Sequence, residues 1–286
     1  LENPTFLKCY GISKDAASKN YIIVIEYAPM GSLKENLNSI KQMKWKDKLT
    51  LLHSIAFDLQ IIHSKNYIHR DLHSGNVLLN NLTSAYIANL GLLMPTNIML
   101  EKQSDKFYGV LPYVAPEVLS KNKYAMASDI YSFGMIMWEV FSGRRLFSER
   151  EYITNLQFDI CNGLRPTISS NMAQCYIDLM KKCWDDDLKK RPSAADICEI
   201  FEIWKYDKTY QLQFIESDDK MSANKAKTTQ NLSLNKTIQN VSLNKTHTGA
   251  IHTTISSLTN SIKYKERINS LPSQGNTINL EDIKEK

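Results

Sequence analysis

The feature that most constrains this chain is the run IHRDLHSGNVLL, which spans Ile68–Leu79. It places Asp71 and Asn76 five residues apart in a polar segment that has apolar, strand-like residues on both sides. A carboxylate that can accept a proton and an amide that can bind a metal ion therefore share one short loop. A base and a metal ligand held this close together suit the chemistry of phosphoryl transfer.

Composition divides the chain into an apolar part and a polar part. Hydrophobic residues make up 43% of the 286 residues, which is enough for a core. Leu, Ile, Trp and Phe are frequent up to Tyr206, whereas Asn, Ser, Thr, Lys and Gln take over from Asp207. We therefore expect one folded domain over residues 1–206 and a polar, disordered tail over residues 207–286.

Charge, hydropathy and cysteine content limit the partners. The net charge of +5 includes no dense basic block with interleaved aromatic residues, so nucleic-acid binding is not expected. No apolar stretch approaches the ~18 residues that span a bilayer, and no signal peptide is present, so no membrane partner is expected. The 5 cysteines form no C-x-x-C pair and are typical of reduced thiols in a cytoplasmic or nuclear protein. The oligomeric state is not indicated, and the start at Leu1 instead of Met indicates missing upstream sequence.

Hydrophobic periodicity predicts short strands near the start of the chain and mainly helices after it. Strand-like runs cover Phe6–Ile12, Tyr21–Tyr27, Asn76–Leu79 and Ala85–Ala88, with a polar turn at Ser13–Asn20. Helical patterns begin at Leu33 and Ser128 and cover Lys46–Ser64, Tyr152–Cys161, Met172–Trp184 and Ala194–Trp204. The helix from Ser128 is apolar almost all round, which predicts a position in the centre of the domain. The stretch Asn89–Glu117 has no sustained period, as is typical of a functional loop.

Four motifs follow one another in a fixed order along the first two thirds of the chain. They are IHRDLHSGNVLL, YVAPEVL at Tyr113–Leu119, SDIYSFGMIMWE from Ser128, and Trp184 followed by RPSA at Arg191–Ala194. Over residues 1 to about 206 the chain thereby resembles the eukaryotic protein kinase family. The Cys-Trp pair before Asp185 is similar to the tyrosine-kinase-like branch of that family.

The resemblance implies an α+β, protein kinase-like fold. Its helical C-terminal lobe would comprise residues 31–206, and only the last strands of the N-terminal lobe would be present, with residues 1–30 as their remnant and the hinge. In this family a Glu117–Arg191 ion pair holds the architecture. Asp129, on the central helix, fixes the backbone of the catalytic loop.

The resemblance also implies roles for the catalytic loop. Asp71 would accept the proton of a substrate hydroxyl, and His69 and Arg70 would complete the catalytic motif. Arg70 would pair with a phosphorylated residue of the following loop, for which Ser104 and Tyr108 are candidate acceptors.

ATP and Mg²⁺ are the cofactors that the resemblance implies. Asn76 and Asn89 would bind the metal. For the nucleotide, Glu26 and Ala28 would offer backbone hydrogen bonds at the hinge. Ile25 would be the gatekeeper, and Leu78 would pack beneath the adenine ring.

Several positions depart from the family pattern. Asn89-Leu90-Gly91 stands where the family has Asp-Phe-Gly, so a full negative charge beside the metal is lost. No G-x-G-x-x-G or V-A-I-K occurs in the 286 residues. His73 and Val110 replace the Lys and Thr usual in serine/threonine kinases, which leaves the acceptor specificity open.

Three interpretations follow from this pattern. The first is a protein kinase-family domain, whose family reaction is ATP-dependent phosphoryl transfer to a protein Ser/Thr, or Tyr, hydroxyl in signalling. Because of the departures we expect little or none of this activity in the chain alone. The alternative is a pseudokinase that binds a signalling partner as a scaffold. The third is an incomplete gene product without a stable function.

Overall fold

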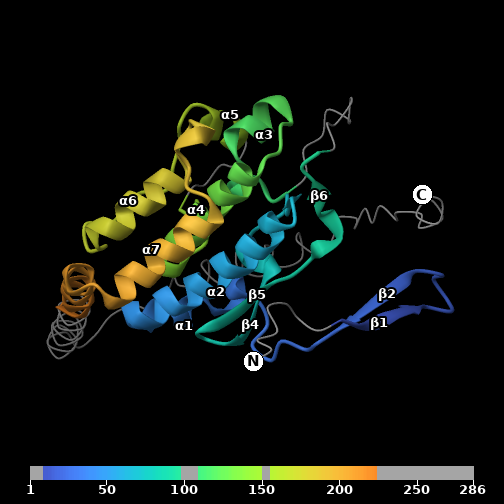
Figure 1. Ribbon diagram of the computed structural model, residues 1–286, viewed down its shortest axis with the longest axis horizontal. Coiled ribbons are helices and arrows are strands. Elements are labelled where there is room, and N and C mark those ends of the chain that lie inside the picture. The colour runs from blue at the N-terminus through green and yellow to red at the C-terminus, as the bar shows by residue number, and fades with distance from the viewer. Residues whose placement is uncertain (1–8, 98–108, 150–154, 224–286) are drawn as a thin grey trace, which may run out of the picture. The chain divides into compact units, whose positions relative to one another are not determined.

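The computed structural model describes residues 9–97, 109–149 and 155–223. Helices predominate in it, and the strands are short (Figure 1). The helices are α1 (Leu33–Gln42), α2 (Trp45–Ser64), α3 (Pro116–Lys121), α4 (Met126–Ser142), α5 (Leu156–Cys161), α6 (Gln174–Cys183), α7 (Ala194–Tyr206) and a further helix over residues 208–223. The strands are β1 (Cys9–Lys14), β2 (Tyr21–Ile25), β3 (Tyr67–Ile68), β4 (Val77–Asn81), β5 (Ser84–Ile87) and β6 (Met94–Pro95).

The strands form three separate two-stranded sheets. β1 pairs with β2, β3 pairs with β6, and β4 pairs with β5, the last two pairs being antiparallel. Residues 12–23 of the β1–β2 pair lie outside the compact unit to which residues 24–223 belong. That compact unit contains the candidate site.

The predicted helical lobe is confirmed, and the predicted helix ends agree with the described ones within two residues. α2 begins at Trp45, α4 at Met126, and α7 ends at Tyr206. The predicted helix over Tyr152–Cys161 is described from Leu156, because residues 150–154 lie outside the described part. The fold is thus the expected α+β, protein kinase-like arrangement with a large helical lobe.

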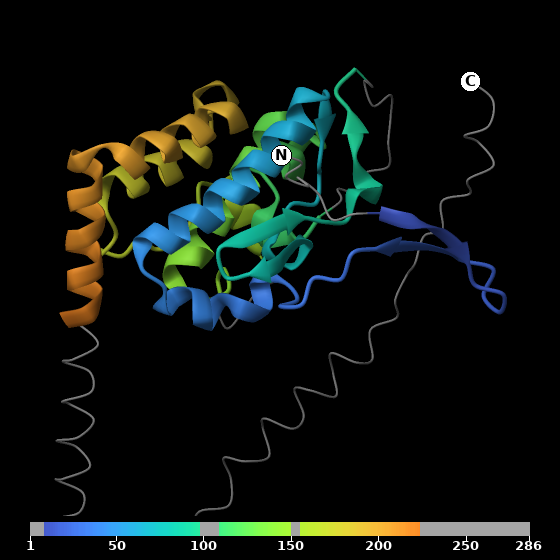
Figure 2. The same ribbon diagram turned by 60° about the horizontal axis from the view of Figure 1, so that its bottom comes forward.

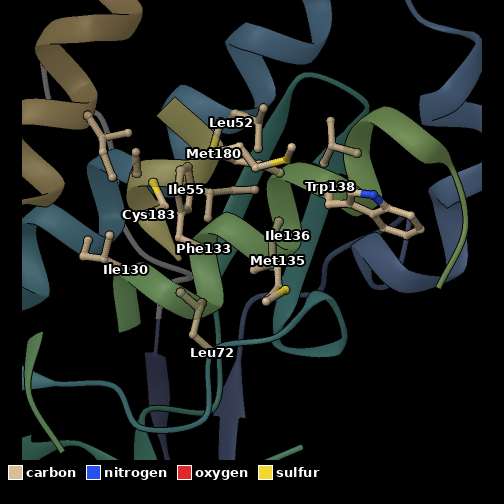
Figure 3. Close-up of a cluster of buried hydrophobic side chains, with 14 of the residues drawn as sticks. Leu52, Ile55, Leu72, Ile130, Phe133, Met135, Ile136, Trp138, Met180 and Cys183 are labelled. Atoms are coloured by element: carbon tan, nitrogen blue, oxygen red, sulfur yellow. The ribbon is translucent and has the colours of Figure 1, made fainter. Parts of the chain in front are cut away.

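Helix α4 forms the centre of the core. Every residue from Ser128 to Phe141 is buried, as the all-round apolar pattern predicts. In Figure 3, Phe133 and Ile136 of α4 lie among side chains contributed by α2 (Leu52, Ile55) and α6 (Met180, Cys183). A Cβ added at Gly134 would stand 2.8 Å from Cβ of Cys183, so glycine at this position permits the close approach of α4 and α6.

Part of Asn89–Glu117 has structure that periodicity did not predict. β6 pairs with β3 in a ladder only two residues long, with Met94 opposite Ile68. α3 is only six residues long and begins with Pro116 as its first residue. Elements this short span less than two helical turns, so no hydrophobic period can develop in them.

The expectation of disorder from Asp207 is wrong for residues 208–223, which form a helix packed on the lobe (orange, after α7, in Figures 1 and 2). Its inner face recurs every three or four residues: Tyr210, Phe214, Ser217 and Met221 are buried or half-buried, and the residues between them are mostly exposed. The mean polarity of the whole tail conceals this stripe. Residues 224–286 lie outside the described part, so the prediction for them stays a prediction.

Candidate active site

Asp129 of α4 anchors the backbone of the loop that carries Asp71. The Asp129 carboxylate accepts the backbone N–H of His69 at 2.8 Å and that of Arg70 at 3.0 Å. His63, at the end of α2, contacts the same carboxylate through Nε2 at 2.9 Å. Asp129 is 2% exposed, so these bonds act without competition from water. The predicted anchoring of the loop by Asp129 is confirmed.

Two amide side chains converge on the Asp71 carboxylate. Asn76 donates through Nδ2 to the backbone carbonyl of Asp71 at 2.8 Å and to its Oδ2 at 2.9 Å. Asn89 donates through Nδ2 to the same Oδ2 at 3.2 Å, from a left-handed backbone conformation with φ 63° and ψ 50°. The structure therefore brings the predicted base and both predicted metal ligands together.

His73 faces the other oxygen of the same carboxylate. Its Nδ1 accepts the backbone N–H of Gly75 at 3.0 Å, and its Nε2 lies 3.6 Å from Oδ1 of Asp71. Because Nδ1 accepts a hydrogen bond, the ring proton of the neutral imidazole lies on Nε2 and points towards Asp71. A Cβ at Gly75 would stand 2.8 Å from Cε1 of His73, so glycine makes room for the ring.

These donors determine the acidity of Asp71. Burial acts to raise the pKa of this carboxyl, but the nearby His73 ring and the hydrogen bond from Asn76 outweigh it and hold the pKa below its ordinary value. Asp71 is therefore a stable carboxylate at neutral pH. A low pKa favours the ionised form that a base needs but weakens its pull on a hydroxyl proton.

His69 and Arg70 play different structural parts beside the base. His69 is fully buried, and its Nε2 donates to the carbonyl of Ala88 at 3.0 Å, which joins the loop to the segment that leads into Asn89. Arg70 has a left-handed backbone (φ 73°), and its guanidinium lies over the ring of Tyr124, 4.8 Å from the centroid. The candidate acceptors for its predicted phosphate partner, Ser104 and Tyr108, lie outside the described residues.

A buried hydrogen-bonded chain, which sequence reasoning missed, joins the catalytic loop to α4. The Ser74 and Tyr113 hydroxyls are 2.9 Å apart, and Tyr113 donates to Oε2 of Glu139 at 2.8 Å. Burial raises the pKa of Glu139 and also that of Tyr113, so the tyrosine stays protonated and donates. The polar residues in the otherwise apolar helix α4 were the available signal.

The segment that returns towards the helical lobe passes close to the base at Gly109. This glycine has φ +117°, and a Cβ there would stand 3.1 Å from Val114 Cγ2 and 3.3 Å from the carbonyl oxygen of Arg70. Oδ1 of Asp71 would be 3.8 Å away. Both the backbone conformation and the space require glycine at this crossing.

The buried ion pair predicted between α3 and the start of α7 is present. Arg191 donates to both oxygens of Glu117, at 2.8 Å and 3.0 Å. It also donates to the carbonyls of Asp185 and Ala127. Four of its five N–H donors thus join separate segments of the lobe to one another.

Comparison with known proteins identifies the family. A model of the protein tyrosine and serine/threonine kinase family matches residues 1–201. The chain belongs to this family. A probable LIM domain-containing serine/threonine-protein kinase of Dictyostelium discoideum is 32% identical over 203 residues, which cover 70% of this chain and 30% of the relative. A putative serine/threonine-protein kinase/receptor of Acanthamoeba polyphaga mimivirus is 33% identical over 183 residues, or 63% of this chain and 11% of the relative. The kinase domain thus spans less than a third of the length of these relatives.

The predicted nucleotide-binding residues of the kinase domain lie on two adjoining segments. Ala28 is buried, and its carbonyl accepts the N–H of Gly31, whose own carbonyl accepts the N–H of Leu79 on β4. This places the segment after the hinge beside half-buried Leu78. Ile25, at the end of β2, is 44% exposed, and Glu26 is exposed as well. Their roles stay predictions.

Kinases of this family generally use ATP and Mg²⁺, and the two predicted metal ligands of this chain, Asn76 and Asn89, can be compared with the ligands that Mg²⁺ prefers. Both Asn76 and Asn89 direct Nδ2 at Asp71, which leaves their amide oxygens for a cation. Neither oxygen carries a charge, and Mg²⁺ is held in proteins mainly through carboxylates. Within the described ranges, no group of three or more His, Cys, Asp or Glu side chains could hold a metal ion. The donor set therefore does not fit a tightly bound Mg²⁺.

One further property concerns membranes. Among the helices in the described part of the chain, none has both the length and the apolar content needed to cross a bilayer.

Proposed function

We propose that the chain is a protein kinase domain of the tyrosine-kinase-like branch, directed at Ser/Thr hydroxyls of protein substrates, with little or no phosphoryl transfer of its own. Its setting would be signalling in the cytoplasm or nucleus, which the free state of the five cysteines supports. The Cys-Trp-Asp sequence at 183–185 supports the branch. The Ser/Thr kinases among its relatives support the acceptor class.

One observation carries the proposal: the amides of Asn76 and Asn89 both donate to Oδ2 of Asp71. The base is thus oriented by the protein itself, with its backbone anchored on Asp129. In phosphoryl transfer Asp71 would accept the proton of the acceptor hydroxyl through an oxygen of this fixed carboxylate. The same geometry puts an uncharged NH₂ group where the family has a carboxylate oxygen, so the charge that favours transfer is missing.

The second candidate is a pseudokinase that binds a signalling partner. The network around Asp71 favours it, because Asn76 and Asn89 both donate to one carboxylate oxygen and the His73 ring lies 3.6 Å from the other. Binding by such a module would use the surface of the lobe and would not depend on Asp71.

Phosphoryl transfer is measured directly with radiolabelled ATP, Mg²⁺ and a generic protein substrate. We expect little or no incorporation by the purified chain. Robust incorporation that Asp71→Asn abolishes would contradict the expectation of weak transfer and establish an active kinase. Robust incorporation that survives Asp71→Asn would contradict the role of Asp71.

The substitution Asn89→Asp isolates the missing charge. It exchanges NH₂ for an oxygen at 3.2 Å from Oδ2 of Asp71, so two carboxylates would face each other and favour a cation between them. We expect Mg²⁺ to raise the melting temperature of Asn89→Asp but not that of the native chain. Occupancy at 100 times Kd corresponds to roughly 2.7 kcal/mol. A clear Mg²⁺ shift in the native chain would favour the enzyme over the pseudokinase, and equal responses of both proteins would show that Asn89 is not at the cation site.

A further inference from the structure

The helix over residues 208–223 lies beyond the part of the chain that the family model matches, residues 1–201. It nevertheless belongs to the same compact unit as the helical lobe. In Figures 1 and 2 it follows α7 at the end of the lobe where α2 begins. Its contacts show what it contributes there.

Two helices of the lobe begin without a capping side chain of their own. The N-cap residue of α2 is Lys44 and that of α6 is Ala173, and neither makes a side-chain cap. Lysine and alanine are poor N-caps because they offer no oxygen to the free N–H groups of the first turn. Both helix starts therefore need acceptors from elsewhere in the chain.

The 208–223 helix supplies both acceptors. The Asp218 carboxylate accepts the N–H of Trp45, the first residue of α2, at 3.3 Å and 3.4 Å. Oε1 of Gln213 accepts the N–H of Cys175, in the first turn of α6, at 3.1 Å. A carboxylate at the start of α2 also opposes the positive end of the helix dipole.

Apolar packing holds these acceptors in place. Phe214 is 5% exposed and lies against two tryptophans, with ring centroids 5.0 Å from Trp45 and 5.4 Å from Trp204. Ser217, 1% exposed, donates to the carbonyl of Asn171 just before α6. The helix thus contacts α2, α6 and α7 through a single face.

α2 connects this contact to the candidate active site. Its first residue, Trp45, is capped by Asp218, and His63 near its last turn contacts the Asp129 carboxylate that holds the backbone N–H of His69. Helix formation is cooperative, and both contacts lie on this one helix. α2 therefore contacts both the 208–223 helix and the residue that anchors the catalytic loop.

We propose that residues 208–223 form a built-in brace, which caps α2 and α6 in place of local N-caps and thereby sets the order of the catalytic loop. The brace is part of the folded kinase domain, and its face made by Gln213, Phe214, Ser217 and Asp218 is specific for the two helix starts. This inference does not depend on catalytic activity.

Amide hydrogen exchange on the full chain tests it. Asp218→Ala removes one cap, and we expect exchange of the Trp45 amide to rise about fivefold, the factor that one N-cap corresponds to. Asp219→Ala is the matched control, because Asp219 is the next acid on the same helix and is exposed. We expect no change for that variant.

Phe214→Ala opens the whole brace. We expect faster exchange at the Trp45, Cys175 and His69 amides together. This variant can also unfold the lobe, so exchange is measured in the native chain as well. In the native chain, the amides of residues 208–223 should be protected to the same degree as those of α7. Exchange of 208–223 at free-peptide rates, or equal effects of Asp218→Ala and Asp219→Ala, would overturn the proposal. A response at the helix starts without one at His69 would overturn the link to the catalytic loop.

Discussion

At the scale of single residues, the active site is a set of donors around one carboxylate. Asn76 and Asn89 satisfy Oδ2 of Asp71, while His73 faces Oδ1. Of the two amides, Asn76 lies on the same loop motif as Asp71, and its contact with Asp71 could be suspected from the sequence; Asn89 lies outside that motif. His73 directs a ring N–H at Asp71 because its Nδ1 accepts the N–H of Gly75, and the sequence alone does not specify this tautomer.

The contribution of His73 to the acidity of Asp71 is testable. Because the nearby His73 ring lowers the pKa of Asp71, His73→Ala should move that pKa upward, towards its ordinary value. His73→Gln can restore a donor near Oδ1 and should reverse part of the change. The ¹³C shift of the Asp71 carboxyl carbon, followed against pH, measures the effect. His53→Ala, a partly exposed histidine on α2, is the control, and a matching shift in that variant would refute a local cause.

Asp58 on α2 makes stability depend on pH. Burial raises its pKa to about 7, although the N–H of Ile87 donates to it at 2.9 Å. The folded state therefore keeps the proton between about pH 4 and pH 7 while the unfolded state releases it, so stability falls as pH rises through this window. Asp58→Asn should remove the slope, which for one proton is about 1.4 kcal/mol per pH unit. Urea unfolding from pH 4.5 to pH 7.5 measures it, and parallel curves for both proteins would contradict the assignment.

At the scale of elements, ion pairs and hydrogen bonds to loop carbonyls connect the helices. Arg191 joins the start of α7 to Glu117 of α3 and to the carbonyl of Ala127 in the first turn of α4. The pair is nearly inaccessible to water, with Arg191 7% and Glu117 9% exposed. Removing one partner of such a pair is costly, because the other charge then stays buried without compensation.

Arg191→Ala should destabilise the domain by roughly 3–5 kcal/mol, because it leaves the Glu117 carboxylate buried without its partner. Glu117→Gln combined with Arg191→Met removes both charges and should recover part of this loss. Recovery would be incomplete, since the bonds from Arg191 to the carbonyls of Asp185 and Ala127 are also lost. Denaturant unfolding of the three proteins gives the comparison. A double variant no more stable than Arg191→Ala would contradict a buried-charge penalty.

The elements also show how far sequence reasoning reached. α2 and α7 were predicted within two residues because each buries a periodic stripe, and the start of α4 was predicted as closely because that helix is apolar almost all round. β3, β6 and α3 were not predicted, since two- to six-residue elements depend on tertiary contacts. The 208–223 helix was missed because its single apolar stripe is diluted by a strongly polar tail. In the site, motif spacing indicated Asp71 and Asn76, and the family resemblance indicated Asn89, whereas the Tyr113–Glu139 bond joins residues far apart in the chain.

At the scale of the whole molecule, apolar side chains on the β1–β2 pair affect behaviour in solution. All residues of β2 are exposed, and Tyr21, Ile22, Ile23, Val24 and Ile25 retain between 44% and 63% of their accessible surface. Successive side chains of a strand point to opposite sides, so both sides of β2 are apolar. Exposed apolar strands promote association between chains.

We therefore expect the chain to self-associate at high concentration, and Ile23→Lys to reduce this association. Ile23 is 63% exposed, so the substitution should leave the free energy of unfolding within about 0.5 kcal/mol of the native value. Light scattering against concentration measures the effect. Leu212→Lys, which changes an equally exposed leucine (65%) on the 208–223 helix, is the control. Equal reduction by both variants would indicate a general charge effect.

The crossing at Gly109 has a wider consequence. A methyl group at that position would press on the Arg70 carbonyl and come within contact distance of the Asp71 carboxylate. The position of the backbone at Gly109 and the position of the Asp71 carboxylate therefore depend on the same close contact, although the two residues are far apart in the sequence. A larger residue at position 109 would displace the Asp71 carboxylate before it unfolded the domain.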